Sequence, residues 1–494
     1  MLWLAFFFSL ALYFFSFPPF DLFFLAWVAP LPLTLAGVSL SSKRRFLLWW
    51  LWGTFFFFAS LYWLPGTMMA YAPVAGWLAW GTLGILALYL GLYWGLWGWW
   101  SLLLVERGVP PFLAFSAVLS FLELVRGHLL TGFPWLLAAH SQAPFLPFVQ
   151  GAALVGVYGL SFFLAWSWGG ALDLLRGARL RGGVALLLPP LPIGWGWARM
   201  ARLPHGKPIK VALVQPNIPA QMKWDPARAR EQVKLLVDMV GEACRGEDLV
   251  VLPETVYPYS LFQNPSKTRP FLDAVKGCSA FVLVGTNHVM TKGGRLFYKN
   301  RVYLLSKVGV LGVYDKVHLV PFGEYVPLGD YFPFLYGLAG YERGFLPGRD
   351  LSPLPMPTSP LGVGVCYETI FPSLARVQVK KGAGLLVNVT NDAWFGRSLA
   401  PYQHLTAALF RAVENGRWLI RCANTGISAL VSPEGRVVVQ TPLFTRRILR
   451  GEVEATSQIT PYTTLGDWLP LLSGFFVFLF LVVGYFKPGY FSDR

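Results

Sequence analysis

The hydrophobic pattern divides this chain into an almost unbroken apolar part and a part that alternates like a soluble protein. From Met1 to about Met200, apolar and aromatic residues follow one another with few interruptions. A helix that crosses a membrane needs about 20 apolar residues. Runs of this kind lie at residues 2–17, 20–40, 46–64, 72–104, 110–126, 150–173, 183–199 and 466–486. The pattern predicts a membrane domain over residues 1–200 with seven transmembrane helices, a soluble domain over 208–456 and a C-terminal transmembrane helix over 466–486.

Basic residues in the short loops predict how these helices are oriented. They lie after the second, fourth and sixth predicted spans: Lys43, Arg44, Arg45, Arg107, Arg176, Arg179 and Arg181. Because such loops stay on the cytoplasmic side, seven spans place the soluble domain outside, and the eighth returns the tail with Lys487 and Arg494 inside. The first run lacks a basic stretch before it and a small-residue cleavage site after it. We therefore expect a retained helix and not a signal peptide.

One stretch of the apolar part is unusually polar. It holds Glu123, Arg126 and His128, followed by the run 131–135, Thr-Gly-Phe-Pro-Trp. Charges at membrane depth are expensive and raise the question of function. The structural alternative is an ion pair between Glu123 and Arg126, three residues apart on a helix near the outer interface. The pattern favours this structural interpretation, with the Thr-Gly-Phe-Pro-Trp run as a helix break and an aromatic anchor.

From Ile209 the pattern changes to short apolar runs separated by segments with helical spacing. Strands are predicted at residues 209–216, 248–254, 281–286, 302–305, 310–314, 361–366, 384–389, 427–431 and 436–439, and helices at 226–243 and 401–415. Such alternation is typical of sheets that are covered by helices.

The composition supports a membrane protein and argues against a nucleic-acid-binding one. Of the 494 residues, 55% are hydrophobic and only 13% are charged, whereas a soluble protein carries about 25% charged residues. The net charge of +16 could suit nucleic acid, but no basic block is longer than residues 43–45 and no recognition motif is present. Membrane topology and anionic headgroups explain the basic residues better.

The cysteines and histidines do not indicate a metal or another cofactor. The four cysteines, Cys244, Cys278, Cys366 and Cys422, form no CxxC pair, and the six histidines are scattered. No spacing resembles a zinc site. A disulfide between Cys244 and Cys278 stays open at this point.

Three polar residues end hydrophobic strands and suggest acyl chemistry: Glu254, Lys316 and Cys366. Each residue alone could have a purely structural role, since a terminal Glu is usually a solvated strand end and a lone buried Cys is usually inert. Together they meet a chemical need. A thiol must lose its proton before it attacks, and the carbonyl oxygen that becomes an anion needs a cation or N–H donors.

Several runs of residues carry a family resemblance. Those around the three polar residues are Leu252-Pro253-Glu254, residues 314–327 and Val365-Cys366-Tyr367-Glu368. Further runs are Glu123 to Trp135, Asn388 to Gly396 and Gln403-His404-Leu405. On these runs the soluble part resembles the nitrilase superfamily, and the whole chain resembles the apolipoprotein N-acyltransferase family. The resemblance implies a multi-pass α-helical membrane domain plus an α/β nitrilase-like domain, an α-β-β-α sandwich, in the bacterial cytoplasmic membrane with the catalytic domain on the outer face.

The resemblance also implies an activity and roles for the three residues. A phospholipid would donate an acyl chain, through a thioester, to the N-terminal amine of the diacylglyceryl-cysteine of an apolipoprotein. Cys366 would be the nucleophile, Glu254 the general base and Lys316 the stabiliser of the oxyanion. Such ping-pong chemistry is physically reasonable, because an amine can attack a thioester once its proton has an acceptor. Nothing in the sequence requires more than a monomer.

Five further residues match family positions near the site. We expect Glu324 to orient Lys316 or to share the role of base, and Glu368 to hold the local geometry; the alternative for both is an ordinary salt bridge. Tyr367 and Trp224 are expected near the substrate, with simple loop packing as the alternative for Trp224. Backbone N–H groups near Cys366 or Trp394 would complete the oxyanion hole. The aromatic, glycine-rich run 331–341 suggests a lid that dips into the outer leaflet, or a static anchor.

A hydrolase and a transporter are the two alternative classes of function. A membrane-tethered nitrilase-like amidase or hydrolase would use the same three residues with water in place of the amine. The apolar spans and the lid argue against it, because a hydrolase of soluble substrates needs neither. A transporter would need charged or broken helices across many spans, and only Glu123 and Arg126 qualify.

Overall fold

The protein is described from a computed structural model that covers residues 1–71, 74–202, 206–223, 225–292, 295–329, 331–332, 334 and 344–486. The chain divides into two compact units. The first comprises Met1–Gly66, Ala75–Leu203 and Thr460–Arg494, and the second comprises Thr67–Val74 and Pro204–Ile459.

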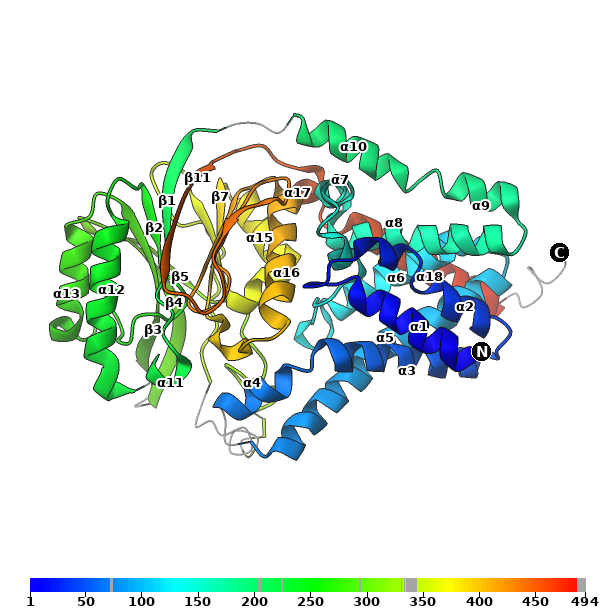
Figure 1. The fold of residues 1–494 in the computed structure, drawn as a ribbon, viewed down its shortest axis with the longest axis horizontal. Coiled ribbons are helices and arrows are strands. Elements are labelled where there is room, and N and C mark those ends of the chain that lie inside the picture. The colour runs from blue at the N-terminus through cyan, green and yellow to red at the C-terminus, as the bar shows by residue number, and fades with distance from the viewer. Residues whose placement is uncertain are drawn as a thin grey trace. The chain divides into compact units, whose positions relative to one another are not determined.

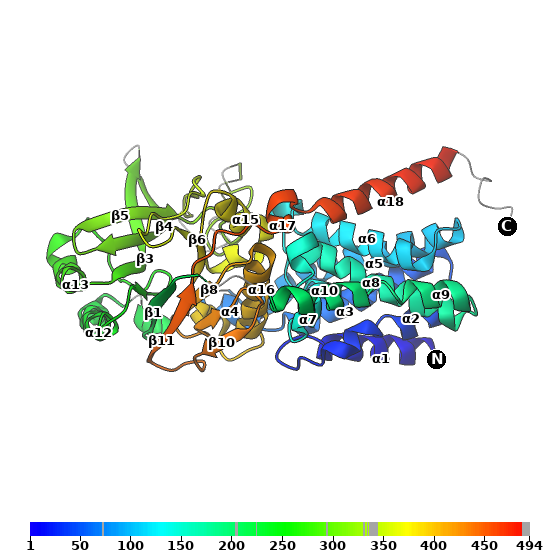
Figure 2. The same cartoon turned by 90° about the horizontal axis from the view of Figure 1, so that it is seen from above.

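The first unit is helical (Figures 1 and 2). Its elements are α1 (Leu2–Phe15), η1 (Phe23–Trp27), α2 (Leu31–Gly37), α3 (Ser42–Ser60), α4 (Leu64–Tyr71, shared with the second unit), α5 (Gly76–Glu106), α6 (Pro111–Arg126), η2 (Leu129–Thr131), η3 (Ala138–Gln142), α7 (Leu146–Val149), α8 (Ala152–Leu175), α9 (Arg179–Ala185), α10 (Pro190–Met200), α17 (Pro461–Leu465) and α18 (Trp468–Phe486). These apolar helices are consistent with a membrane domain. In the part of the chain that the structure describes, α5 and α8 are each long and apolar enough to cross a membrane, and α3 with α4 could form a third, bent span.

Two of the segments that the sequence predicts as single helices are broken. Residues 20–40 form the 3-10 turn η1 and the short helix α2, and residues 183–199 divide between α9 and α10. Prolines explain both breaks, since Pro30 and Pro32 lie at the start of α2 and Pro189 and Pro190 at the start of α10. The count of eight spans stays a prediction.

The buried ion pair that the sequence suggests in the apolar part is present. An Arg126 guanidinium nitrogen lies 3.8 Å from a Glu123 carboxylate oxygen, and both side chains are buried on α6. The same oxygen accepts a hydrogen bond from the Ala138 N–H at 2.7 Å. Arg126 also donates to the Leu136 carbonyl and lies over the Phe57 ring. Both charges therefore have structural partners within the helical unit.

The second unit is a sandwich of two sheets. Its elements are β1 (Pro208–Gln215), α11 (Ala220–Lys223), η4 (Pro226–Arg228), α12 (Ala229–Ala243), β2 (Leu249–Val251), α13 (Pro265–Lys276), β3 (Phe281–Lys292), β4 (Arg295–Ser306), β5 (Gly309–Asp315), β6 (Leu361–Val365), η5 (Cys366–Ile370), α15 (Pro372–Lys380), β7 (Leu385–Thr390), η6 (Asp392–Phe395), α16 (Ala400–Asn415), β8 (Leu419–Ala423), β9 (Ala429–Val431), β10 (Val437–Gln440) and β11 (Arg447–Glu454). One sheet has the order β11-β1-β2-β3-β4-β5, and the other β10-β9-β8-β7-β6.

Apolar side chains on both faces of the strands explain the layers. Val211 of β1, Val363 of β6 and Val387 of β7 belong to one buried core between the sheets. A second core joins the other face of the six-stranded sheet to α12 and α13 through residues such as Leu236 and Phe271. Figures 1 and 2 both show α12 and α13 on one side of the sandwich and α15 and α16 on the other. The α-β-β-α order agrees with the nitrilase-like fold expected from the sequence.

A disulfide joins Cys244, at the end of α12, to Cys278, just after α13. The sequence left this pairing open. The bond links the two helices that cover the six-stranded sheet and lies outside the group of strand ends described next.

Candidate active site

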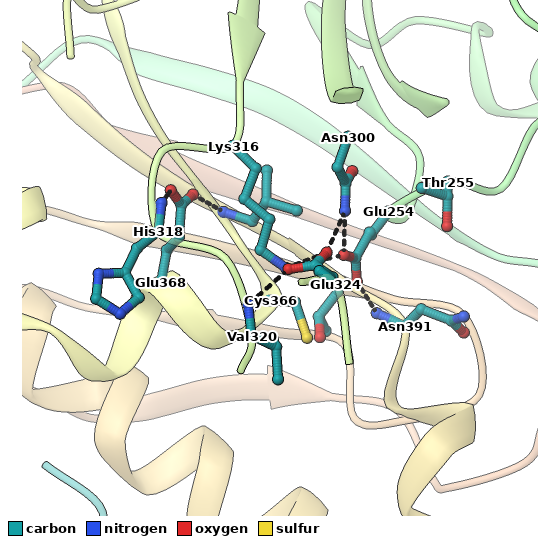
Figure 3. Close-up of polar contacts among 12 residues, drawn as sticks. Glu254, Thr255, Asn300, Lys316, His318, Val320, Glu324, Cys366, Glu368 and Asn391 are labelled. Carbon is teal, nitrogen blue, oxygen red and sulfur yellow. Dashed lines mark hydrogen bonds and ion pairs between the residues drawn. The ribbon is translucent and has the colours of Figure 1, made fainter. Parts of the chain in front are cut away.

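The three residues selected from the sequence lie at the ends of three strands. Glu254 follows β2, Lys316 follows β5 directly, and Cys366 follows β6 directly. Figure 3 shows the Lys316 side chain ending between the carboxylates of Glu254 and Glu324, with the Cys366 sulfur beside them. β2 and β5 belong to one sheet and β6 to the other, so the site lies where the ends of the two sheets meet.

The backbone of Cys366 is strained. Its φ angle is +50°, a region that residues other than glycine rarely adopt and that costs about 1–3 kcal/mol. The strain lies at the junction of two elements, because β6 ends at Val365 and the 3-10 helix η5 begins at Cys366.

The Cys366 thiol is protonated at rest. Burial of the thiol and the nearby Glu254 carboxylate raise its pKa, while the positive charge of Lys316 opposes the rise only in part. A neutral thiol is a weak nucleophile and needs a base to take its proton as it attacks.

Lys316 is held by two carboxylates. Its ammonium nitrogen lies 2.8 Å from Oε1 of Glu324 and 3.4 Å from Oε1 of Glu254, and the side chain is buried. Burial opposes the charged form, but Glu324 and Glu254 more than offset it and raise the pKa of Lys316. Lys316 is therefore a permanent cation beside the thiol. The expectation that Glu324 orients Lys316 agrees with this geometry, and Glu324 is itself held by the Val320 N–H at 2.8 Å.

Glu254 is fixed by donors from both sheets. The Asn300 amide donates to Oε1 at 2.7 Å, and the Asn391 N–H donates to Oε2 at 3.0 Å. The backbone of Glu254 lies against Gly285, where an added Cβ would meet the Pro253 carbonyl oxygen at 2.6 Å. Only glycine allows this close approach. The carboxylate thus has one oriented position, which suits a residue that takes and returns a proton.

Glu368 connects the loop that begins at Lys316 to strand β6, which directly precedes Cys366. Its carboxylate accepts hydrogen bonds from the backbone N–H groups of Val317, His318 and Val365 at 2.7–2.9 Å, and from the Tyr314 hydroxyl at 3.0 Å. Burial raises the pKa of Glu368 to about 7, although these N–H donors favour the ionised form. Because Val317 follows Lys316 and Val365 precedes Cys366, this carboxylate sets the spacing of the two reactive groups.

The other residues that the sequence predicts near the site are Tyr367, Trp394 and Trp224, together with the expected lid. Tyr367 is half-buried beside the His318 ring, at 5.9 Å between centroids, and burial raises the pKa of its hydroxyl. Trp394 is half-buried, and its carbonyl accepts a hydrogen bond from the Thr67 hydroxyl at 2.8 Å. Trp224 and most of the expected lid at 331–341 lie outside the described residues. The exposed side chains of Phe332 and Phe334 belong to the described part of that run.

Two site residues were missed by sequence reasoning. Asn300 donates to both Glu254 and Glu324, at 2.7 and 3.1 Å, and so bridges the two carboxylates. Lys223 is buried and donates to the Thr255 hydroxyl at 2.6 Å, and burial lowers its pKa to about 8. Neither residue gave a usable signal, because Lys299-Asn300-Arg301 reads as a polar surface run and Lys223 as a loop residue.

The site holds a carboxylate, a cation and a thiol, and these groups suit acyl transfer. Among the described residues, no group of three or more His, Cys, Asp or Glu could hold a metal ion. A carboxylate that accepts the thiol proton and an ammonium that faces the developing oxyanion are the two aids that thiol attack on a carbonyl requires.

Known proteins of one family match both units. The model of the carbon-nitrogen hydrolase family matches residues 210–462, and the model of the apolipoprotein N-acyltransferase N-terminal domain matches residues 9–169. The apolipoprotein N-acyltransferase of Geobacter metallireducens is 38% identical over 92% of this chain and 89% of its own length. That of Chromobacterium violaceum is 33% identical over 96% and 92%.

Among solved structures, a Saccharomyces cerevisiae member of the nitrilase superfamily is similar, with 22% identity and a TM-score of 0.40 over 51% of this chain and 91% of that one. The sequence relatives cover nearly the whole chain. The chain belongs to the apolipoprotein N-acyltransferase family.

Proposed function

We propose that this member of the apolipoprotein N-acyltransferase family moves an acyl chain from a phospholipid to the N-terminal amine of an S-diacylglyceryl-cysteine on an apolipoprotein. The observation that carries the proposal is the group of Glu254, Lys316 and Cys366 at adjoining strand ends, in which Glu254 and Lys316 are buried and Cys366 is half-buried. The same chain also carries a long apolar helical region. The thiol accounts for acyl transfer, and the apolar region accounts for lipid substrates.

The first half-reaction loads the enzyme. Glu254 takes the proton of the Cys366 thiol as the sulfur attacks the ester carbonyl carbon of the phospholipid. The carbonyl oxygen becomes an anion that the Lys316 ammonium stabilises. The ester C–O bond then breaks, and the lysophospholipid leaves with the proton from Glu254. The acyl chain stays on Cys366 as a thioester.

The second half-reaction discharges it. The α-amine of the diacylglyceryl-cysteine, once neutral, attacks the thioester carbon and passes a proton to Glu254. The C–S bond breaks, and the Cys366 thiolate regains that proton. The product is an N-acylated lipoprotein, and the free enzyme returns to its starting charge.

The location follows from the same proposal. We place the protein in the bacterial cytoplasmic membrane as a multi-pass monomer with the catalytic unit on the outer face. The basic short loops support this orientation. The Cys244–Cys278 disulfide supports it independently, because such bonds persist in oxidising compartments and are rare in the cytosol.

Intact-mass analysis after incubation with phospholipid tests the proposal. Wild type should gain the mass of one fatty acyl group, Cys366→Ala should not, and Cys422→Ala should, because Cys422 is the other free cysteine and lies buried in the core. An active wild type without an acyl increment would contradict the thioester route. Addition of a diacylglyceryl peptide should discharge the group as an amide, whereas release of free fatty acid would favour a hydrolase.

A further inference from the structure

A second polar network lies behind Cys366, and the proposed mechanism does not use it. Its centre is Arg421 of β8, which is fully buried. The Nη2 atom of Arg421 lies 2.8 Å from Oδ2 of Asp392, and its Nη1 atom donates to the side-chain oxygen of Asn388. The Thr390 hydroxyl also donates to Asp392, at 2.8 Å. Burial opposes ionisation of Asp392, but Arg421 and its other partners lower the pKa of Asp392, so the ion pair is permanent.

Two arms of this network reach the strand that carries the nucleophile. The amide nitrogen of Asn388 donates to the carbonyl of Gly364 at 3.1 Å. The Nε2 atom of His404, on α16, lies 3.1 Å from the carbonyl oxygen of Cys366. Arg421 therefore contacts both Asn388 and His404, the side chains that bind the carbonyl groups on either side of Val365.

The contact with Cys366 defines the role of one His404 nitrogen. A carbonyl oxygen only accepts, so Nε2 carries a proton in that contact. Nδ1 lies 3.0 Å from Nη2 of Arg421, which donates, and 3.2 Å from Oδ1 of Asp392, which accepts. Burial and the charge of Arg421 lower the pKa of the ring, while Asp392 opposes them. His404 thus offers its Nε2–H to the nucleophile's own peptide group.

We propose that His404, oriented by Arg421 and Asp392, is a positioning residue that holds the Cys366 peptide in its strained left-handed conformation. The residue needs such a hold because φ is +50° and a strained residue persists only when its surroundings over-determine it. His404 contacts the carbonyl oxygen of Cys366, so it acts through the backbone. The proposal rests on Cys366 being the nucleophile of the proposed function.

The test compares variants that keep or lose the N–H aimed at Cys366. In His404→Gln the amide nitrogen can take the place of Nε2, whereas in His404→Asn it can replace only Nδ1, and His404→Leu has no donor. Gln378→Leu is a matched control, because the buried Gln378 amide donates to the carbonyl of Val363 on the same strand, at 2.7 Å. It removes an equivalent hydrogen bond without touching the peptide of the nucleophile.

Two rates are measured on the full-length protein in detergent: formation of the acyl-enzyme from phospholipid, and alkylation of Cys366 by iodoacetamide. His404→Leu and His404→Asn should slow acyl-enzyme formation by about 100-fold with an unchanged half-saturating phospholipid concentration, as expected when a reacting group is displaced. His404→Gln and Gln378→Leu should stay within about tenfold of wild type, because they keep this contact. Alkylation should follow the same order.

Equal rates in the Asn and Gln variants would overturn the proposal, and so would equal losses in His404→Leu and Gln378→Leu. If His404→Leu does not fold, the comparison of Asn with Gln still decides. A wild type that is alkylated at Cys366 but never acylated would contradict the proposed function, and the order of alkylation rates would still test the role of His404.

Discussion

The Lys316 ammonium lies 2.8 Å from Oε1 of Glu324, so the cation that faces the thiol is already paired before any substrate arrives. Glu254 lies on the same ammonium at 3.4 Å. Burial of the thiol and the Glu254 charge raise the pKa of Cys366, and the Lys316 charge offsets them only in part. These surroundings favour the neutral form of the thiol.

Removal of the Glu254 charge and removal of the Lys316 charge should move the pKa of the Cys366 thiol in opposite directions. Glu254 raises the pKa of Cys366 and Lys316 lowers it. Glu254→Gln should therefore lower the pH at which iodoacetamide alkylation reaches half its maximal rate, and Lys316→Met should raise that pH. Glu254→Gln should nevertheless lose about 10²–10⁴-fold in acyl-enzyme formation, since the proposed base is gone. Shifts of the two variants in the same direction would rule out this account of the charges.

Loss of the bridge between the two carboxylates should reduce activity. Asn300→Leu leaves Glu254 and Glu324 without their shared donor, and acyl-enzyme formation should fall by about 100-fold. Asn300→Asp should be slower still, because it adds a third negative charge. The matched control is Asn287→Leu, since Asn287 pairs with Asn300 across the β3–β4 ladder. If the two leucine variants lose activity equally, the bridge is not the cause.

Glu368→Gln should destabilise the catalytic unit. The Glu368 carboxylate accepts from three backbone N–H groups and one hydroxyl group, all of which are donors, so an amide would turn its NH₂ group toward an N–H or O–H group. The loss should be about 1–3 kcal/mol in free energy of unfolding, measured by denaturant titration in detergent. The control Glu242→Gln changes an exposed carboxylate on α12 and should stay within about 0.5 kcal/mol of wild type.

The Cys244–Cys278 disulfide should stabilise the protein without affecting chemistry. The bond closes a loop of 34 residues, which corresponds to about 4 kcal/mol in the chain-entropy model. The double variant Cys244→Ala/Cys278→Ala should therefore unfold at a lower denaturant concentration and keep its acylation rate at moderate temperature. Protein isolated and denatured without reductant should show two thiols that react with maleimide, those of Cys366 and Cys422. Four reactive thiols would contradict the bond.

The proposed orientation can be tested by labelling single cysteines in spheroplasts of a Cys366→Ser background. An impermeant maleimide should label Lys307→Cys, in the exposed turn between β4 and β5, in intact spheroplasts. It should label Lys43→Cys, in the basic run at the start of α3, only after lysis. The reverse pattern would place the catalytic unit on the cytoplasmic side.

Much of the sandwich could be predicted from local pattern, and two of the misses involve polar residues. The predicted strands at 361–366 and 384–389 correspond to β6 and β7 because each is a short apolar run that is buried on both faces. β8 was missed although Leu419–Ala423 is fully buried, because Arg421 interrupts its apolar pattern. The partners of Arg421 lie far away in sequence, since Asp392 and Asn388 are 29 and 33 positions from it. The long β3–β4 hairpin extends into polar residues that read as a loop.

The sequence by itself determined the division into an apolar helical part and a catalytic part, and it placed Glu254, Lys316 and Cys366 at strand ends. Hydrophobic periodicity is a local property, and a strand end is visible wherever the periodicity stops. Only the tertiary structure decided three contacts at the site. Asn300 bridges the carboxylates of Glu254 and Glu324, Glu368 connects the loop after Lys316 to β6, and His404 faces the Cys366 carbonyl. These contacts join residues 24 to 51 positions apart, and such polar groups are stable in a buried site only after folding has brought their partners together.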